Sequence, residues 1–237
     1  MAARVAPEFA HVRDWIFDLD NCLYPASSGL FALIDERMTA YIQRLLDCDA
    51  EEAHRVQKDH FHTHGTTLAG LMKNLEVDPH HFLEDVHDIP LDRIGRNERL
   101  AALLERLPGR RFVFTNGDAP YARRVLEAIG VHDRFDDVHD LHANSYRPKP
   151  DLHGYELLCE RFGIDPRHAL MVDDMARNLE PAKILGMTTV WVDNGSERGG
   201  HDADPDMIDF TVPDIGALAR ESGLRLVAFL EPVRYEP

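Results

Sequence analysis

Two carboxylates, Asp18 and Asp20, follow directly on a short apolar segment that begins at Trp15. The segment from Trp15 to Leu19 is rich in apolar and aromatic residues, which predicts a buried strand of a parallel sheet. Because open α/β sheets bind ligands beyond the carboxyl ends of their strands, we expect both carboxylates to lie in a site. Their oxygens suit a hard divalent cation such as Mg2+, which proteins hold with carboxylates, water and substrate phosphate.

A calcium loop also begins with an Asp-x-Asp pattern, but the following residues exclude it. Counted from Asp18, the loop would need a glycine at the place of Leu23 and a glutamate at the place of Gly29. The remaining alternative is that the two acids only cap a strand and enter a turn. For an isolated pair that alternative would be preferred, so the decision depends on the other strand ends.

Further polar residues follow the next predicted strands of the chain. They are Thr115, Asn116 and Gly117 after the segment 111–115, Lys149 after the segment 137–141, and Asp173 and Asp174 after the segment 169–172. Each group alone would be typical of a turn or a solvated loop. Parallel strands end at one edge of a sheet, so the joint occurrence favours a single site that also contains Asp18 and Asp20.

The elements that would position these residues alternate between strand and helix. Beyond the strands already given, we predict strands over 188–192 and 210–212 and helices over 100–107, 119–129, 150–162, 179–185 and 215–221. This alternation predicts an α/β fold with a doubly wound, Rossmann-like parallel sheet. No definite helix or strand is predicted after Leu224.

Residues 24–96 differ in pattern, because apolar residues recur there at helical spacing and no strand is indicated. The predicted helices are 30–45, 49–60, 66–75 and 80–87, the last with Asp78 and Pro79 at its start. We therefore expect an inserted α-helical cap domain at 24–96. The core domain would comprise 1–23 and 97–237.

Composition limits the possible partners. The 237 residues carry a formal net charge of -16, which argues against binding of nucleic-acid polymers or anionic membranes. No run approaches the ~20 apolar residues of a membrane span, and the charged N-terminal segment lacks the apolar core of a signal peptide. Three widely spaced cysteines indicate reduced thiols. We expect a cytoplasmic protein, monomeric or homodimeric, with a small-molecule partner.

The series of motifs resembles that of the haloacid dehalogenase-like phosphatase superfamily. The matching residues are Asp18-Leu-Asp20-Asn-Cys-Leu-Tyr24, Thr115-Asn-Gly117, Lys149-Pro150 and Val172-Asp-Asp174-Met-Ala-Arg-Asn178. The resemblance covers roughly residues 13–195. The form of the first motif, followed by a helical cap, is similar to the pyrimidine 5'-nucleotidase branch of that superfamily.

The resemblance implies a role for each motif in phosphoryl transfer. Asp18 would be the nucleophile that forms an aspartyl-phosphate, and Asp20 would be the general acid and base. Thr115 and the backbone amide of Asn116 would hold phosphoryl oxygens. Lys149 would offset the repulsion between the anionic substrate and the nucleophile.

The resemblance also implies a Mg2+ site and substrate contacts. Mg2+ would be bound by Asp18, the backbone carbonyl of Asp20 and Asp173, with Asp174 supporting it directly or through water. Residues expected to contact the substrate are Asn116, Gly117, Tyr24 and Arg147. Tyr24, Phe31 and Phe61 are candidates for stacking on a base, and Asn116 or Asp118 for contacting the leaving group.

The sequence departs from the superfamily pattern at two places. Cys22 stands where a threonine is usual, and we interpret it as a packing residue. The third motif, Arg147-Pro-Lys149-Pro, offers two cations. We prefer Lys149 as the catalytic cation because its spacing to Tyr155-Glu156 matches the nucleotidase branch, and we keep Arg147 as the alternative.

The function predicted from these residues is a Mg2+-dependent phosphatase for a small phosphomonoester, with a pyrimidine nucleoside 5'-monophosphate as the first choice. Phosphoglycolate or a sugar phosphate is the alternative substrate, and a phosphomutase is an alternative activity. A haloacid dehalogenase needs no acid at the position of Asp20. A phosphorylated receiver module places its acidic pair before the phosphorylated aspartate, which is the reverse of the order here.

Overall fold

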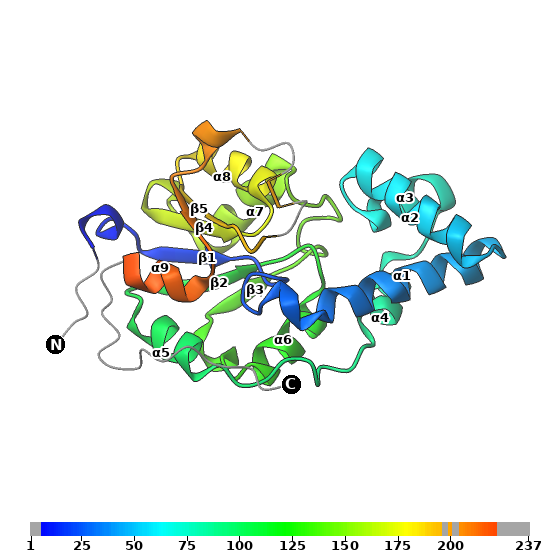
Figure 1. Cartoon of the computed structure of the whole chain (residues 1–237). Coiled ribbons are helices and arrows are strands. Elements are labelled where there is room, and N and C mark those ends of the chain that lie inside the picture. The colour runs from blue at the N-terminus through cyan, green and yellow to red at the C-terminus, as the bar shows by residue number, and fades with distance from the viewer. Residues whose placement is uncertain (1–5, 196–198, 201–203, 222–237) are drawn as a thin grey trace.

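The core of the protein is a parallel sheet in the strand order β3-β2-β1-β4-β5-β6 (Figure 1). The computed structural model describes residues 6–195, 199–200 and 204–221. The strands are β1 (Asp14–Phe17), β2 (Arg110–Phe114), β3 (Asp137–His139), β4 (Ala169–Asp173), β5 (Thr188–Val192) and β6 (Phe210–Val212). The chain passes from β1 outward to β3 and then crosses to β4, so the strand order reverses beside β1. Doubly wound sheets bind ligands at such a reversal.

Helices cover both faces of the sheet, as Figure 1 shows. One layer consists of α5 (Glu98–Arg106), α6 (Ala119–Ala128) and α9 (Ile215–Glu221), and the other of α7 (Leu152–Phe162) and α8 (Leu179–Leu185). Successive residues of β1 enter opposite layers: Trp15 and Phe17 belong to one apolar cluster and Ile16 to the other. A strand covered on both faces is apolar along its length, which explains the composition of this segment.

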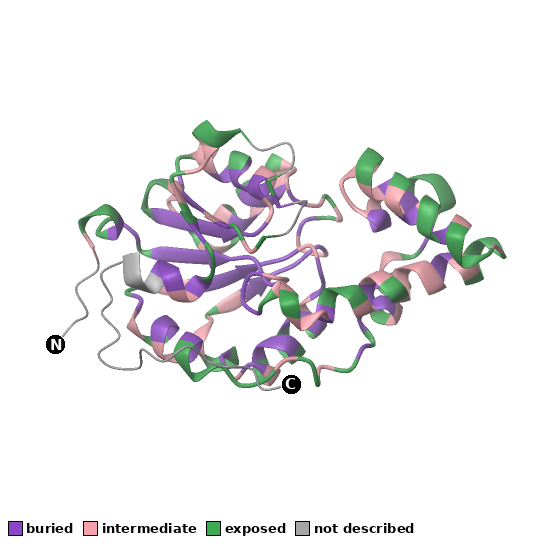
Figure 2. Cartoon of the chain, in the orientation of Figure 1, coloured by how far each residue is buried: buried purple, intermediate pink, exposed green. Residues whose placement is uncertain are grey.

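Four helices follow β1 and lie to one side of the sheet. They are α1 (Leu30–Leu46), α2 (Ala50–His64), α3 (Thr67–Leu75) and α4 (Pro79–His87). Side chains of Asp49, Thr66 and Asp78 accept backbone N–H groups at the starts of α2, α3 and α4. Figure 2 shows much of the surface of these helices exposed, in contrast to the buried strands. The division into a core (1–23 and 97–237) and a cap (24–96) stays our proposal.

The fold class is confirmed, and several element ends differ from prediction. The first strand ends at Phe17 instead of Leu19, because the chain enters a turn in which the backbone N–H groups of Cys22 and Leu23 donate to the carbonyl of Leu19. The third strand ends at His139 instead of Leu141, since the Asp140 carboxylate accepts the backbone N–H groups of Ala119, at the start of α6, and of Ala143 in the following loop. The predicted tail after Leu224 lies outside the described residues.

Among residues 6–195, 199–200 and 204–221, none of the helices combines the length and the apolar composition needed to cross a membrane.

Candidate active site

The ammonium group of Lys149 lies at the centre of the site. Its Nζ donates to Asp18 Oδ1 at 2.7 Å, to Asp173 Oδ2 at 2.7 Å and to the carbonyl of Phe114 at 3.0 Å. Lys149 is 1% exposed, and these three contacts give each hydrogen of its buried ammonium an acceptor. The lysine thus joins the ends of three neighbouring strands, β2, β1 and β4.

The charged groups around Lys149 shift one another's pKa values. Burial alone would lower the pKa of Lys149, but the carboxylates of Asp173 and Asp18 raise it above its ordinary value. Burial raises the pKa of Asp18 well above its usual range, although Lys149 acts in the opposite direction. Burial and the neighbouring Asp173 raise the pKa of Asp174 to about 7. The buried carboxylates around Lys149 therefore hold more negative charge than this lysine balances.

Three buried carboxylates form a cluster suited to a divalent cation. One oxygen each of Asp18, Asp173 and Asp174 lies within 4.8 Å of the others. One ammonium leaves two of three carboxylate charges uncompensated, and the donors are all oxygen, as Mg2+ requires. The residues present therefore fit Mg2+. The side chain of Asp20 is not part of this cluster.

The loop after β4 holds the innermost of these carboxylates. Asp173 is fully buried, and its Oδ1 accepts from the backbone N–H of Met175 at 2.9 Å and from Asn178 Nδ2 at 3.0 Å. Asn178 in turn accepts at its backbone carbonyl from the hydroxyl of Tyr155 at 2.5 Å. These contacts fix the orientation of the Asp173 carboxylate, as is usual for residues that support a metal ligand.

The second carboxylate of the first motif, Asp20, is held by two tyrosines. Its Oδ1 accepts from the hydroxyl of Tyr24 at 2.6 Å and from that of Tyr121 at 2.9 Å. Asp20 itself is half-buried and lines the pocket described below. A fixed carboxyl next to a candidate nucleophile can exchange protons with a reacting group.

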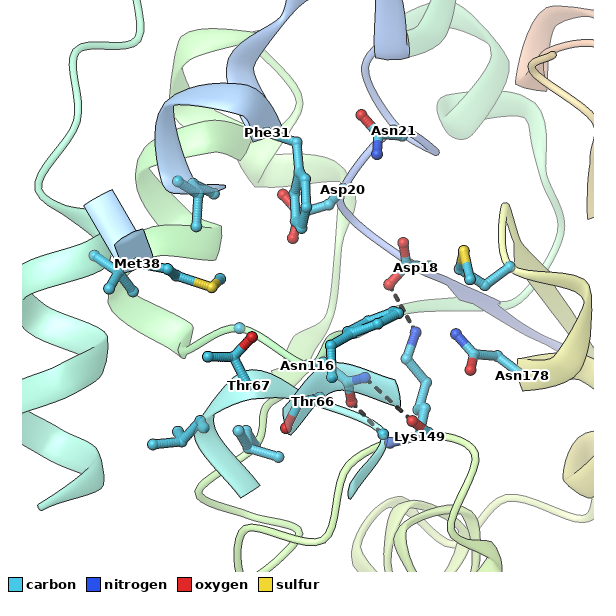
Figure 3. A pocket seen from close by; sticks show the side chains of 18 of the residues that line it. Asp18, Asp20, Asn21, Phe31, Met38, Thr66, Thr67, Asn116, Lys149 and Asn178 are labelled. Atoms are coloured by element: carbon cyan, nitrogen blue, oxygen red, sulfur yellow. Dashed lines mark hydrogen bonds and ion pairs between the residues drawn. The ribbon is translucent and has the colours of Figure 1, made fainter. Parts of the chain in front are cut away.

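Asn116 supports Lys149 rather than only facing the pocket. Its Oδ1 accepts from the backbone N–H of Lys149 at 2.8 Å, and its Nδ2 donates to the carbonyl of Lys149 at 3.3 Å (Figure 3). The hydroxyl of Thr115 is fully buried and accepts from the backbone N–H of Gly117 at 2.9 Å. Asn116 and Gly117 line the pocket, whereas Thr115 does not. The role of Thr115 in holding a phosphoryl oxygen stays a prediction.

A pocket of about 310 Å3 opens between these residues and the helices α1–α4. Asp18, Asp20 and Lys149 line its inner end, and in Figure 3 Lys149 points toward Asp18. The side formed by α1–α4 is mostly apolar, and it includes Phe31, Ile34, Met38, Phe61, Leu68, Phe82, Leu83 and Val86. A ligand in this pocket would meet charge at one end and apolar surface at the other.

Two predicted substrate contacts do not lie in the pocket. Tyr24 is 2% exposed and does not line it, because its hydroxyl is turned to Asp20. Arg147 is exposed and forms an ion pair with Asp151 at 2.9 Å, one helical turn along the chain. Of the two cations in the third motif, the structure brings Lys149 to the carboxylates and leaves Arg147 at the surface.

Cys22 is buried beside the acidic cluster, 6% exposed. Burial and the nearby Asp18 raise the pKa of its thiol well above the usual range. A thiol that stays protonated is a poor nucleophile, which agrees with its interpretation as a packing residue.

Three residues near the site were missed in the sequence analysis. Tyr121 donates to Asp20, the ring of His87 stacks on that of Tyr121, and the guanidinium of Arg177 lies 5.1 Å from the ring centre of Phe61 at the pocket wall. Arg177 stands within the fourth motif, and that position was its only local signal. Tyr121 follows the candidate residue Asp118 by three positions but stands within a predicted helix, and nothing in the sequence near His87 indicates a site.

The sheet and its acidic edge define a doubly wound α/β protein with a candidate site at the carboxyl ends of β1, β2 and β4. Residues 15–186 match the family model described as haloacid dehalogenase-like hydrolase. The chain belongs to this family of hydrolases.

Individual proteins with similar sequences or folds agree with this assignment. The chain is 27% identical to Phosphate metabolism protein 8 of Saccharomyces cerevisiae over 193 residues, which cover 73% of this chain and only 59% of that protein. It is 24% identical to a glyceraldehyde 3-phosphate phosphatase of Methanocaldococcus jannaschii over 221 residues, 87% of this chain and 95% of that protein. The fold is similar to that of a HAD phosphatase from Thermococcus onnurineus, with a TM-score of 0.60, 20% identity and coverage of 88% and 97%.

Proposed function

We propose that the protein is a Mg2+-dependent phosphatase that hydrolyses a small phosphomonoester through an aspartyl-phosphate. The observation that carries this proposal is the pair of carboxylates in one pocket with different partners: Asp18 contacts Lys149, and Asp20 contacts two tyrosine hydroxyls. Different surroundings are how two carboxyl groups take separate roles as nucleophile and acid.

In the first step, a carboxylate oxygen of Asp18 attacks phosphorus and the bond to the leaving oxygen breaks. Asp20 gives its proton to that oxygen, so an alcohol leaves and the phosphoryl group remains on Asp18. Lys149 offsets the repulsion between the anionic ester and the attacking carboxylate, which would otherwise oppose their approach.

In the second step, water attacks the phosphorus of the phosphorylated Asp18. Asp20, now ionised, accepts the proton of that water, and phosphate leaves with Asp18 restored. The net reaction converts ester and water into alcohol and phosphate. Each group ends in its starting state, so the cycle needs no further reactant.

Mg2+ would be held by Asp18 and Asp173, with support from Asp174 and the backbone carbonyl of Asp20. When bound, it would neutralise charge on the phosphoryl oxygens and orient them. The negative charge left over in the cluster of three carboxylates is the reason to expect a divalent ion there.

For the leaving group, we propose a pyrimidine nucleoside, so that the substrate is a pyrimidine nucleoside 5'-monophosphate. Phe31 of α1 and Phe61 of α2 line the pocket and offer aromatic surface to a base. The names of the similar proteins concern phosphate metabolism and a sugar-type phosphate, so phosphoglycolate and sugar phosphates are the alternative substrates.

A dehalogenase would use the same nucleophile on carbon and would need no acid at position 20. The presence of an acid at position 20, held by two hydrogen bonds, therefore favours the phosphatase. A phosphomutase would share all of these residues and return the phosphoryl group to another substrate instead of water. Release of inorganic phosphate distinguishes the two.

The test is phosphate release from UMP, CMP, AMP, GMP, phosphoglycolate and sugar phosphates, each with Mg2+ and with EDTA. Metal-dependent release that favours UMP and CMP supports the full proposal. Preference for another ester retains the mechanism and rejects the nucleotidase assignment. Release that persists in Asp18→Asn would reject the mechanism.

A further inference from the structure

The carboxyl group of Asp20 is oriented by hydrogen bonds to one oxygen only. The hydroxyls of Tyr24 and Tyr121 both donate to Oδ1, and the two hydroxyl oxygens lie 3.4 Å apart. Tyr24 is 2% and Tyr121 1% exposed, and burial raises the pKa of both above the ordinary range, so both stay donors. With Oδ1 occupied, Oδ2 is the oxygen left to exchange a proton with the substrate.

His87, at the end of α4, packs on Tyr121. The ring of His87 is stacked on the ring of Tyr121, with centres 4.3 Å apart and an interplanar angle of 10°. Nδ1 of His87 lies 3.0 Å from Asp118 Oδ1, and that same oxygen accepts the backbone N–H of Tyr121 at 3.0 Å. His87 and Asp118 are each 7% exposed. His87 and Tyr121 are therefore held together both by ring stacking and by a shared carboxylate.

His87 reaches Tyr121 from the end of α4, and α6 fixes it there. Arg124 of α6 donates to the backbone carbonyls of His87 at 3.0 Å and Ile89 at 2.8 Å. The end of α4 is thus attached to the helix that carries Tyr121. His87 also lines the pocket, so this contact lies where the helical segment meets the reacting end of the site.

We propose that His87 and Tyr121 are positioning residues for the general acid: His87 fixes the ring of Tyr121, and Tyr121 fixes the carboxyl of Asp20. The proposal rests on the phosphatase function proposed above. It links the placement of α4 to proton transfer, because loss of the His87 contact frees the Tyr121 ring and hence the Asp20 carboxyl. The step affected is protonation of the leaving oxygen as its bond to phosphorus breaks.

The leaving group provides the test. An alkoxide needs a proton as it leaves, whereas 4-nitrophenolate is stable without one, so a misplaced acid slows an alkyl ester more than 4-nitrophenyl phosphate. We would measure kcat/KM, which reports the first chemical step, for an alkyl phosphomonoester and for 4-nitrophenyl phosphate in Tyr121→Phe and His87→Ala. We expect the ratio of the two values, alkyl over nitrophenyl, to fall by about tenfold or more in both variants.

The chain offers matched controls: His81 lies on α4, as His87 does, and its partner Tyr41 lies on α1. Tyr41 and His81 form a second tyrosine-histidine contact, with the Tyr41 hydroxyl 3.0 Å from His81 Nδ1, and neither lines the pocket. Tyr41→Phe and His81→Ala should leave the ratio unchanged. Equal losses on both substrates in His87→Ala, or a ratio that changes as much in His81→Ala, would overturn the proposal. Lack of wild-type turnover of both esters would instead count against the proposed function.

A second measurement tests the coupling of His87 to Asp20 without an assay of catalysis. If His87 acts on Asp20 through Tyr121, the changes in unfolding temperature caused by His87→Ala and Asp20→Asn should not add in the double variant. Those of His81→Ala and Asp20→Asn should add. Additive changes for His87 and Asp20 would contradict the coupling even in a protein with no measured activity.

Discussion

The side-chain amide of Asn116 holds the backbone of Lys149 at both its N–H and its C=O. The two residues are 33 positions apart in the chain, and their contact joins the loop after β2 to the loop after β3. Because the ammonium of Lys149 must meet three acceptors at once, small displacements of its backbone would break contacts with Asp18 or Asp173. Asn116 therefore helps to keep the positive charge of Lys149 next to the carboxylate of Asp18.

The first prediction follows from this contact. Asn116→Ala should lower kcat by on the order of tenfold to a hundredfold, the range expected when a charge-stabilising group is displaced but not removed. Asn97→Ala is the control, since the Asn97 side chain accepts from Leu100 N–H at the start of α5. That variant should lose about 1 kcal/mol of stability and keep its kcat. An Asn116→Ala enzyme with normal kcat would show that Lys149 needs no such support.

The two cations of the third motif should differ sharply in steady-state kinetics. Lys149→Ala removes the ammonium that contacts Asp18 and should reduce kcat/KM on the order of a hundredfold or more. Arg147→Ala should change it by less than about threefold, because an exposed ion pair contributes little. Lys149→Gln, which keeps a donor, guards against a variant that fails to fold, as judged by circular dichroism. Comparable losses in the lysine and arginine variants would reject Lys149 as the catalytic cation.

Asp174→Asn should raise the stability of the metal-free protein and reduce the stabilisation that Mg2+ gives. Burial and Asp173 raise the pKa of Asp174 to about 7, so its ionised form costs folding free energy at pH 8 without metal. The metal-free variant should melt higher than the wild type, by about 2 to 4 °C for each kcal/mol gained. Added Mg2+ at a hundred times its Kd should stabilise the wild type by about 2.7 kcal/mol and the variant by clearly less.

Calorimetry with and without Mg2+ measures both changes. Asp133→Asn is the control, because that carboxylate is 72% exposed and lies outside the cluster. A larger Mg2+ shift in Asp174→Asn than in wild type would exclude Asp174 from the metal site.

The alternation of strands and helices was enough to predict the sheet, and the polar residues at the strand ends were enough to predict the group at its edge. Asp18, Lys149 and Asp173 could be placed together because each follows a strand of a parallel sheet, and such strand ends meet. That inference depends on short local segments, apolar runs ended by polar residues. The predicted α/β sheet is confirmed, and the structure brings these three side chains into direct contact.

The contacts that orient these side chains could not be predicted in the same way. Tyr121 donates to Asp20 over 101 positions and His87 meets Asp118 over 31, and each depends on the packing of helices that no local pattern defines. Tyr24 illustrates the same difficulty. Its place in the first motif indicated proximity to the site, but only the fold shows that its hydroxyl faces Asp20 instead of the pocket.

The contact between His87 and Asp118 should also appear in the pH dependence of stability. Burial alone would raise the pKa of Asp118, but the hydrogen bond and charge of His87 and the backbone N–H of Tyr121 lower it below its ordinary value. The native state then binds fewer protons at this carboxyl than the unfolded state, so stability rises with pH through this range. Its contribution is complete above the unfolded pKa of about 3.9 and is lost as pH falls through the folded pKa.

Asp118→Asn tests this contribution without removing the helix start, since asparagine is as good an N-cap as aspartate. At pH 6.5 the variant should be less stable than wild type by roughly 1 to 2 kcal/mol, the value of a hydrogen bond to a charged group. The difference should shrink as pH falls from about 5 toward 3, because protonated Asp118 in the wild type loses the same charge. Urea unfolding at several pH values measures it. Stability curves that stay parallel over that range would mean that Asp118 carries no charge-dependent contact with His87.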